Sequence, residues 1–560
     1  MLNRIAVYVS DDLKRAVEAE IKNWKAADKV SRIWQKDASV WTSEDEAKWL
    51  GWLDIVDEEL ANVGRYRDFH SDIEAAGFTD VLLMGMGGSS LCPEVLGITF
   101  GKSNFHILDS TIPAQIKAIE QKIDIDKTLF IVASKSGSTL EPNCFKQYFF
   151  DLVSKRVGKE KAGRQFVAIT DPGSKMEKVA KEDGFRYVFY GKPEIGGRFS
   201  ALSAFGLTAA AAMGIDVETL LQPAKEMADA CKESDENTGL LLGTILGICQ
   251  NQGRDKLTIL TGDEVHDLGA WLEQLIAEST GKKGIGIIPV DREPLVDLDK
   301  YGHDRVFVSL STADGQISSQ QSDLIESLKK SDHPLIDIEL SSIETIGQEF
   351  FRWEFATAVA GSIMGINTFN QPDVESAKIE TRKLTDEYEQ KGSLPEEQPF
   401  FDGDGVKLFT SMEYARELSG DNNSLRSLVA AHLSQIKDRD YFALLAYVQM
   451  NSENEGSLQG IRRKVLDKHG VATCLGFGPR FLHSTGQAYK GGPNSGVFLQ
   501  ITSDDEFDLP VPGQKYTFGV VKAAQARGDF QVLIDRGRRA LRVHLGKDVS
   551  KSLRQLSELI

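Results

Sequence analysis

The chain has 560 residues, which is too many for one hydrophobic core, so we expect two or three domains. Hydrophobic residues make up 41% of the sequence and charged residues 26%, which is typical of globular domains with filled cores. The 65 Lys and Arg residues against 83 Asp and Glu residues leave a net charge of −18. This charge disfavours nucleic acids and acidic membranes as partners, so a binding site for an anion has to be locally basic.

The five cysteines are odd in number and far apart, with no paired spacing: Cys92, Cys144, Cys231, Cys249 and Cys474. This pattern predicts a reduced, cytoplasmic protein without disulfide bonds or a zinc cluster. Residues 1–20 carry charges where a secretion signal would need an apolar run. The most apolar stretch, residues 199–215, is rich in Ala and Gly and short for a membrane span, which favours a buried helix.

Residues 1–75 are expected to form an N-terminal helical cap. From about residue 10 the apolar side chains recur at helical spacing, with Leu13, Val17, Ile21 and Trp24 on one face. Residues 76–225 then alternate strand-like runs with segments of helical length, and the runs are VLLMGM, NFHILD, LFIVAS, QFVAIT and YVFY. Residues 226–379 repeat this design with the runs KLTILTG, GIGIIPV, RVFVSLS and LIDIEL. Such alternation is typical of a doubly wound parallel sheet, so the sequence predicts two α/β domains of this kind.

The C-terminal extension, residues 380–560, begins with a polar stretch whose most loop-like piece is KGSLPEEQPFFDGDG. From about residue 440 strand-like runs return, among them DYFALLAYV, VATCLGFG and VFLQITS. We predict an additional α/β region here and expect it to pack on the second domain.

Two turns of small residues follow apolar strands, in TDVLLMGMGGSS at 79–90 and TLFIVASKSGST at 128–139. Such a turn can open a helix and form a cradle of backbone N–H groups and hydroxyls for a phosphate. The first turn lacks the G-x-G-x-x-G spacing of dinucleotide sites. A helix cap explains one or two hydroxyls, but not all of them together. We therefore predict phosphate binding by these residues: Gly88, Ser89, Ser134, Lys135, Ser136 and Thr139.

These turns resemble those of the sugar-isomerase (SIS) domain, and further motifs resemble the phosphoglucose isomerase family. The motifs are GGRFSALSAFGL at 196–207, AESTGK at 277–282 and GINTFNQPDVESAK at 365–378. LHSTGQAYKGGPNSGVFLQIT at 482–502 is similar to the isomerase part of bifunctional transaldolase/phosphoglucose isomerases. The resemblance covers most of the chain from about residue 40, and no transaldolase half is evident. It implies an α/β fold of two doubly wound SIS domains with the helical cap and the C-terminal α/β extension.

The resemblance implies an enzyme that interconverts glucose 6-phosphate and fructose 6-phosphate by ring opening and a cis-enediol. Glu278 matches the family's E-S-x-G-K motif, which implies that it moves a proton between C1 and C2. A helix end disfavours negative charge, so a carboxylate there takes up a proton readily. Arg198 in GGRFS is implied to stabilise the enediolate with its permanent charge. Without the resemblance, the simpler interpretations are a solvated carboxylate for Glu278 and a structural ion pair for Arg198.

Lys378 and Gln371 resemble the family's Q-x-G-V-E-x-x-K element, whose lysine helps to open the sugar ring and whose glutamine contacts the phosphate. Asp373 stands where that element has glycine, and Thr368 and Asn370 replace a proline and an aspartate.

A histidine is also implied for ring opening. His483 lies in LHSTGQ, which resembles a family motif, although here it follows the glutamate and lysine motifs instead of lying between them. It therefore has to reach the site from the C-terminal extension of its own chain or from a neighbouring subunit. His544 is the rival candidate.

No cofactor is implied, and no metal, because HDLG at 266–269 offers only two possible ligands. The expected partner is a small sugar phosphate, with no nucleic acid and no membrane. By analogy we expect a homodimer, or a part of a transaldolase fusion. Two alternatives remain open: a sugar-phosphate-binding SIS module without catalysis, and an isomerase that also accepts mannose 6-phosphate.

Overall fold

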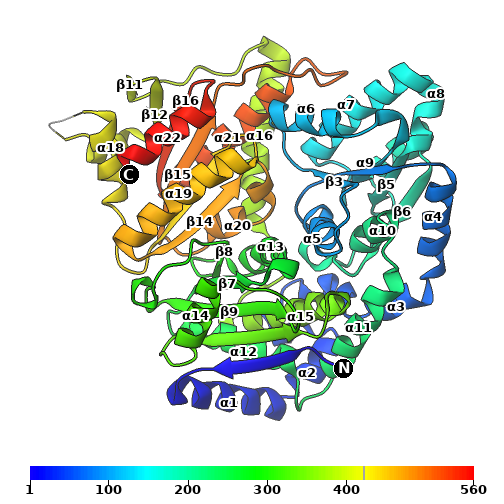
Figure 1. Ribbon diagram of the computed structural model, residues 1–560, viewed down its shortest axis with the longest axis vertical. Helices are drawn as coiled ribbons and strands as arrows, with labels where there is room; N and C mark the ends of the chain where they lie inside the picture. Colours follow the sequence, from blue (N-terminus) through cyan, green and yellow to red (C-terminus); the bar gives the residue numbers. More distant parts are fainter. Residues whose placement is uncertain (421–422) are drawn as a thin grey trace.

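The computed structural model of the protein describes residues 1–420 and 423–560, and the two residues left out lie in the predicted C-terminal extension. The chain builds three sheets, each covered by helices. Figure 1 shows the first sheet at the upper right, the C-terminal sheet at the upper left and the second sheet below both. The predicted α/β fold class is confirmed.

The first sheet is fully parallel, with the strand order β3-β2-β4-β5-β6. Its strands are β2 (Asp80–Gly85), β3 (Phe105–Leu108), β4 (Thr128–Ala133), β5 (Phe166–Thr170) and β6 (Tyr187–Tyr190). The chain leaves β2 toward one edge and β4 toward the other, and Gly85 pairs with Ala133 at their carboxyl ends. Ligands of such sheets bind where the strand order reverses, and both predicted phosphate turns begin at this point.

The second sheet has the order β1-β10-β9-β7-β8. The four predicted strands are parallel: β7 (Lys256–Thr261), β8 (Ile288–Asp291), β9 (Arg305–Thr312) and β10 (Leu335–Leu340). The fifth, β1 (Arg4–Tyr8), pairs antiparallel with β10 and corrects the prediction that residues 1–75 are a helical cap. These five residues form a strand because they pair with the open backbone edge of β10. Since β10 is far away in the sequence, the spacing of nearby apolar residues does not reveal this pairing.

The C-terminal sheet has the order β11-β12-β16-β15-β13-β14. Three strands were predicted: β13 (Tyr441–Tyr447), β14 (Ala472–Phe477) and β15 (Gly496–Ser503). The sequence analysis missed β16 (Arg539–Leu545), which extends the parallel part, and the antiparallel hairpin of β11 (Phe401–Gly403) and β12 (Val406–Phe409). The first strand of the hairpin lies in the piece that looked most loop-like, and the second follows it directly.

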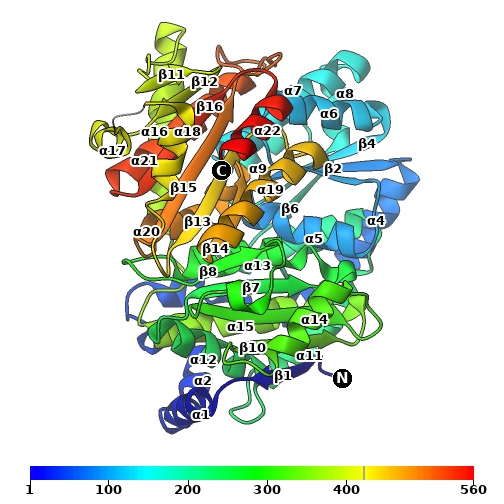
Figure 2. The ribbon, with the colours of Figure 1, turned by 60° about the vertical axis from the view of Figure 1, so that its left-hand side comes forward.

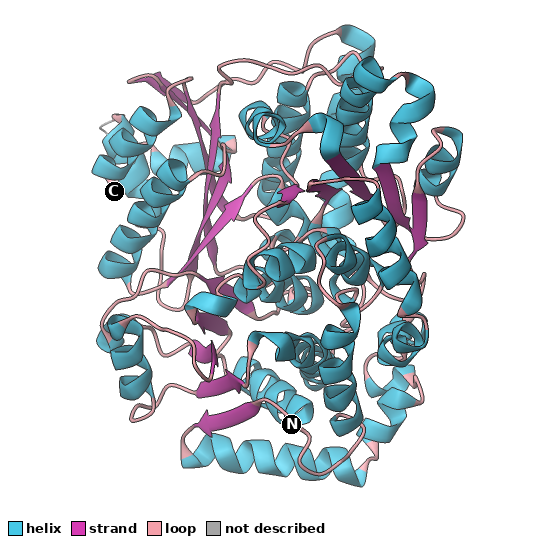
Figure 3. Ribbon diagram, turned by 45° about the vertical axis from the view of Figure 1, so that its right-hand side comes forward, coloured by secondary structure: helices cyan, strands magenta, loops and turns pink. Residues whose placement is uncertain are grey.

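Helices lie on both faces of the sheets (Figure 3). The N-terminal part contributes α1 (Asp11–Ala26), α2 (Lys29–Trp34), α3 (Ile55–Ala61) and α4 (Gly64–Ala75). Beside the first sheet follow α5 (Leu91–Thr99), α6 (Pro113–Lys122), α7 (Leu140–Val157), α8 (Lys159–Ala162), α9 (Lys175–Glu182) and α10 (Ala204–Ala212). The next part holds α11 (Val217–Ala230), α12 (Thr238–Asn251), α13 (Leu268–Thr280), α14 (Ser319–Leu328) and α15 (Ile346–Met364). The last part holds α16 (Pro372–Lys391), α17 (Met412–Leu418), α18 (Leu425–Leu433), α19 (Ser452–His469), α20 (Gly486–Gly491), α21 (Phe518–Asp535) and α22 (Val549–Leu559).

The stretch at 199–215 contains α10, which is buried throughout. Among the helices that the structure describes, none is both long and apolar enough to cross a membrane. All five cysteines are buried and unpaired.

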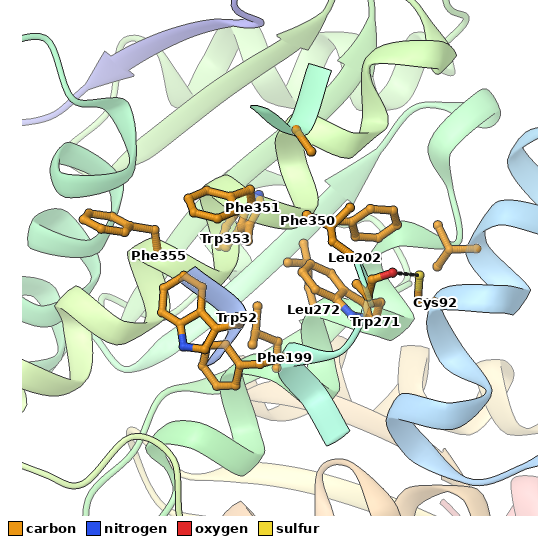
Figure 4. Packing of buried hydrophobic residues seen from close by; sticks show 14 of the residues in the cluster. Trp52, Cys92, Phe199, Leu202, Trp271, Leu272, Phe350, Phe351, Trp353 and Phe355 are labelled. Carbon is orange, nitrogen blue, oxygen red and sulfur yellow. Dashed lines mark hydrogen bonds between the residues drawn. The ribbon is translucent and has the colours of Figure 1, made fainter. Parts of the chain in front are cut away.

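The largest apolar core lies around α15 and the turn that carries Phe199 (Figure 4). The ring of Trp52 lies 5.4 Å from that of Phe199 and 5.7 Å from that of Phe351 on α15. Phe199 also packs on Phe369, with ring centroids 5.2 Å apart. Phe199 follows Arg198 and Phe369 precedes Gln371 by two positions, so this core fixes two segments that carry predicted site residues.

The C-terminal sheet packs on the second sheet, as expected, and Figure 2 shows β14 lying above β8. The contact is polar as well as apolar. Arg305 of β9 is fully buried and donates to both carboxylate oxygens of Glu293, at 2.8 and 3.1 Å. Glu293 in turn accepts from the backbone N–H of Thr473 on β14, at 2.6 Å.

We expect Arg305→Met to lower the free energy of unfolding by about 3–5 kcal/mol, because the variant leaves Glu293 buried without its cation. Chemical denaturation with fluorescence detection measures the change. The control is Arg554→Met, which removes an exposed pair with Glu453 and should cost less than about 1 kcal/mol. Equal effects of the two substitutions would contradict the assignment of Arg305 to the sheet junction.

Candidate functional site

Three predicted motifs meet because glycines let their backbones approach closely. A Cβ on Gly88 would lie 1.9 Å from the carbonyl oxygen of Gly197, so any side chain there would separate the two turns. Gly87 has a φ of +55°, and a Cβ on it would lie 2.6 Å from the carbonyl oxygen of His483. The GMGGSS turn therefore touches both the GGRFS turn and the LHSTG loop.

Glu278 lies in the last turn of α13 and is 7% exposed. One carboxylate oxygen accepts a hydrogen bond from Nε2 of Gln274 at 3.1 Å, and the other lies 3.8 Å from the guanidinium of Arg198. Gln274 also donates to the carbonyl oxygen of His483, at 2.9 Å. The sequence analysis missed Gln274, although its position one helical turn before Glu278 places it on the same face of α13. It links the predicted base to the loop of the predicted ring-opening histidine.

Arg198 is 1% exposed, and each of its three guanidinium nitrogens donates a hydrogen bond. It donates to Oγ of Ser279, to Oε1 of Gln371 and to the carbonyl oxygen of Thr368, each at 2.7 Å. Burial lowers the pKa of Arg198, and the nearby Glu278 carboxylate opposes this shift. Gln371 is thus brought to the site, but in this structure its side-chain oxygen is held by Arg198.

Lys282 is a second buried cation of the site, which the sequence analysis did not single out although it ends AESTGK. Its ammonium donates to the carbonyl oxygens of Asn367 and Asn370, at 2.8 and 2.5 Å. Burial, together with the neighbouring guanidinium of Arg198, lowers the pKa of Lys282 well below its ordinary value. The segment 367–371 is therefore held from two sides by cations.

The serine-rich turn lies between β4 and the N-terminus of α7. Ser134 is buried, and its hydroxyl has no hydrogen-bond partner in the described structure. The Ser136 and Ser138 hydroxyls lie 2.8 Å apart, and Thr139 occupies the N-cap position of α7 without a side-chain capping bond. A helix N-terminus with unused hydroxyls can receive an anion.

Lys135, which was also predicted to bind phosphate, makes its contacts within the protein. Its ammonium pairs with the carboxylate of Asp171 and donates to the carbonyl oxygen of Lys192, at 2.9 Å. It contributes positive charge beside the turn, but its hydrogen bonds are used within the protein.

His483 forms a pair with Glu141. Its Nε2 lies 2.9 Å from a carboxylate oxygen of Glu141, and that same oxygen accepts from Nε2 of Gln525 on α21 at 2.6 Å. Burial alone would raise the pKa of Glu141, but the charge and hydrogen bond of His483 outweigh burial and hold the pKa below its ordinary value. Lys378 on α16 lies near enough to act in the same direction. Its own side chain is 43% exposed and lies 3.7 Å from Glu375.

The sequence analysis missed Glu141, although it stands two residues after the serine-rich turn. An acidic residue in the first turn of a helix has an ordinary explanation in the helix dipole, so nothing local marked it. The rival histidine, His544, lies on β16 and binds Thr502 at 3.0 Å and Asp504 at 3.3 Å. Both partners belong to the C-terminal sheet region, and the structure thus brings His483, not His544, to the other candidate residues.

Two solved structures share the fold. A hypothetical protein from Thermus thermophilus matches with a TM-score of 0.59 and 23% identity, over 68% of this chain and 99% of that one. A glucose-6-phosphate isomerase from Chlamydia trachomatis matches with a TM-score of 0.50 and 20% identity, over 65% of this chain and 78% of that one. Both matches show that the α/β fold is shared with these proteins.

The sequence comparisons find similarity to one family of enzymes. Residues 64–289 match the profile of the family described as phosphoglucose isomerase. Glucose-6-phosphate isomerase from Methanocaldococcus jannaschii is 28% identical over 366 residues, covering 59% of this chain and 88% of that protein. The enzyme of the same name from Gloeothece citriformis is 31% identical over 350 residues, covering 54% of this chain and 65% of that protein. Over these residues the chain is similar to the phosphoglucose isomerases.

We expect Glu141→Gln to lower the free energy of unfolding by about 1.5–3 kcal/mol near neutral pH, because it removes a buried carboxylate with two hydrogen bonds. A carboxylate whose pKa is depressed on folding stabilises the fold above its ordinary pKa of 4.5, and this contribution disappears as the pH falls through the folded pKa. The difference in unfolding free energy between the variant and the wild type should therefore narrow as the pH falls below about 5.

Urea titrations of both proteins at several pH values measure this difference. Glu160→Gln, at an exposed position on α8, is the control and should show no such dependence. If the difference in unfolding free energy between the variant and the wild type stayed constant with pH, Glu141 would act by packing alone.

Proposed function

We propose that this chain interconverts glucose 6-phosphate and fructose 6-phosphate by ring opening followed by proton transfer through a cis-enediol. The observation that carries the proposal is Glu278, a nearly buried carboxylate between Arg198 and Gln274 at the place where the family's motifs meet. The match of residues 64–289 to the phosphoglucose isomerase profile and the similar enzyme from Methanocaldococcus jannaschii support the same reaction. The residue roles below are part of the proposal.

The phosphate of the sugar binds at the serine-rich turn. Its oxygens accept hydrogen bonds from the hydroxyls of Ser134, Ser136 and Thr139 and from the backbone at the start of α7. Gly88 and Ser89, after the neighbouring strand β2, line the same switch point of the sheet. Lys135 adds positive charge, and Gln371 assists from the side of Arg198.

Ring opening is assigned to His483 and Lys378. An imidazole can move a proton between the ring oxygen and the hydroxyl at C1, and the carboxylate of Glu141 fixes its orientation. Lys378 lies on the same side, since its charge acts on Glu141.

Proton transfer is assigned to Glu278. In the open sugar it takes the proton from one of the carbons C1 and C2 and returns it to the other. The intermediate carries negative charge on oxygen, and Arg198 stabilises that charge without giving up its own proton. Because Arg198 is buried and already oriented by Ser279, little reorganisation accompanies the step.

The proposal also covers the setting of the enzyme. We place it in the cytoplasm, with a small sugar phosphate as its partner and no cofactor. A homodimer, or a place in a transaldolase fusion, is part of the proposal by analogy alone.

Glu278→Gln should lower kcat by about 10²–10⁴-fold, since it removes the base and keeps the shape. Fructose 6-phosphate converted in deuterium oxide should gain deuterium at C2 with the wild-type protein and not with the variant, as measured by NMR. Glu413→Gln, at an exposed position of α17, is the control and should retain full activity. Normal turnover by the Glu278 variant would refute this assignment of the base.

Ser134→Ala should raise KM for fructose 6-phosphate by about 10–100-fold, since a hydrogen bond to a charged group is lost. Stability should not fall, because the hydroxyl has no partner to lose within the protein. Ser154→Ala on α7 is a matched control, since that hydroxyl is also buried and unpartnered but lies more than three helical turns from the helix start. An unchanged KM in the Ser134 variant would place the phosphate elsewhere.

A further inference from the structure

We infer that the active site is complete within one chain, with the C-terminal extension acting as an intramolecular partner that supplies His483 to the site of its own chain. This inference rests on the proposed function. It addresses the question that the order of the motifs leaves open, because His483 follows Glu278 and Lys378 in the sequence and has to come from elsewhere in space.

The first observation is how the histidine loop is seated. Its backbone touches Gly87, and its carbonyl oxygen at His483 accepts from Gln274 of the same chain. Farther along, a Cβ on Gly281 would lie 2.3 Å from the Cα of Ala488, so α20 packs directly on the end of α13. Hydrogen bonds whose donors and acceptors are both buried join these segments.

Gln487 makes two of these bonds. Its Nε2 donates to the carbonyl oxygen of Gly281 at 2.9 Å, and its Oε1 accepts from the backbone N–H of Asp373 at 3.0 Å. One side chain of the extension therefore bridges the ends of the two motifs that carry Glu278 and Lys378.

The second observation is how the partner of the histidine is held. Glu141 belongs to the first α/β part, and Gln525 of α21 donates to it. The hydroxyl of Thr111 then donates to Oε1 of Gln525 at 2.7 Å, and all three side chains are buried. The extension thus supplies the histidine and also fixes the carboxylate that orients it.

A third set of contacts fastens the extension beside the site. Arg480, three residues before His483, forms ion pairs with Glu94 at 2.6 Å and Asp109 at 2.7 Å. The rings of Phe145 and Phe518 stack with centroids 6.1 Å apart. Glu141 already has His483 and Gln525 of its own chain as partners. A second copy could therefore place its own histidine there only if this loop left its buried partners.

The test uses two variants of the full chain, Glu278→Gln and His483→Ala, that carry different affinity tags. The wild-type chain is assayed first with fructose 6-phosphate, and the two variants are then coexpressed and purified over both tags in turn. If each site is built from one chain, mixed oligomers have no intact site and should show only the summed activities of the separate variants.

If sites were shared between subunits, a mixed dimer would hold one intact site and one doubly altered site, and about half of the wild-type activity would return. That result would overturn the inference. If no mixed oligomer is recovered, specific activity should stay constant over an about 1,000-fold dilution, and a loss of activity on dilution would count against the inference. An inactive wild-type chain would instead refute the proposed function.

Discussion

The buried guanidinium of Arg198 is the constraint on which the rest of the site depends. A charge that is removed from water is tolerated only where its donors are satisfied and an opposite charge is near. Ser279 and Glu278 at the end of α13 and the segment 367–371 meet these demands, and these two parts are far apart in the chain. Their positions are therefore linked, because a shift of any one leaves a buried donor without its acceptor.

The sheet topology explains why these segments can meet at all. Strands β2 and β4 are neighbours whose connections run in opposite directions, which opens a crevice at their carboxyl ends. The turns after both strands are built from small residues, and at Gly87 and Gly88 the packing leaves no room for a side chain. Close backbone approach, instead of long side chains, thus brings the motifs together, which keeps the site rigid and leaves hydroxyls free for a ligand.

Local sequence patterns were sufficient for most of the buried parallel strands, though not for β16, and for the residues in contiguous motifs. The strands of the first sheet and the four parallel strands of the second were predicted, as was the placement of Glu278 at a helix end. Long-range pairing was not accessible in this way. The strand β1 exists because β10 has an open edge, and Gln525 acts on Glu141 across 384 residues. In both pairs, the sequence around one partner does not indicate the other.

The same distances set the order in which the site can form. His483 and Glu141 are 342 residues apart, and their bond requires the C-terminal sheet to have docked on both other parts. The cluster around Arg198 needs a shorter but still long-range closure, between Arg198 and Gln371, which are 173 residues apart. Since loop closure precedes the gain from long-range contacts, the base and its cation can be arranged before the ring-opening pair is. Ring opening is thus the step of the proposed reaction that depends on the complete fold.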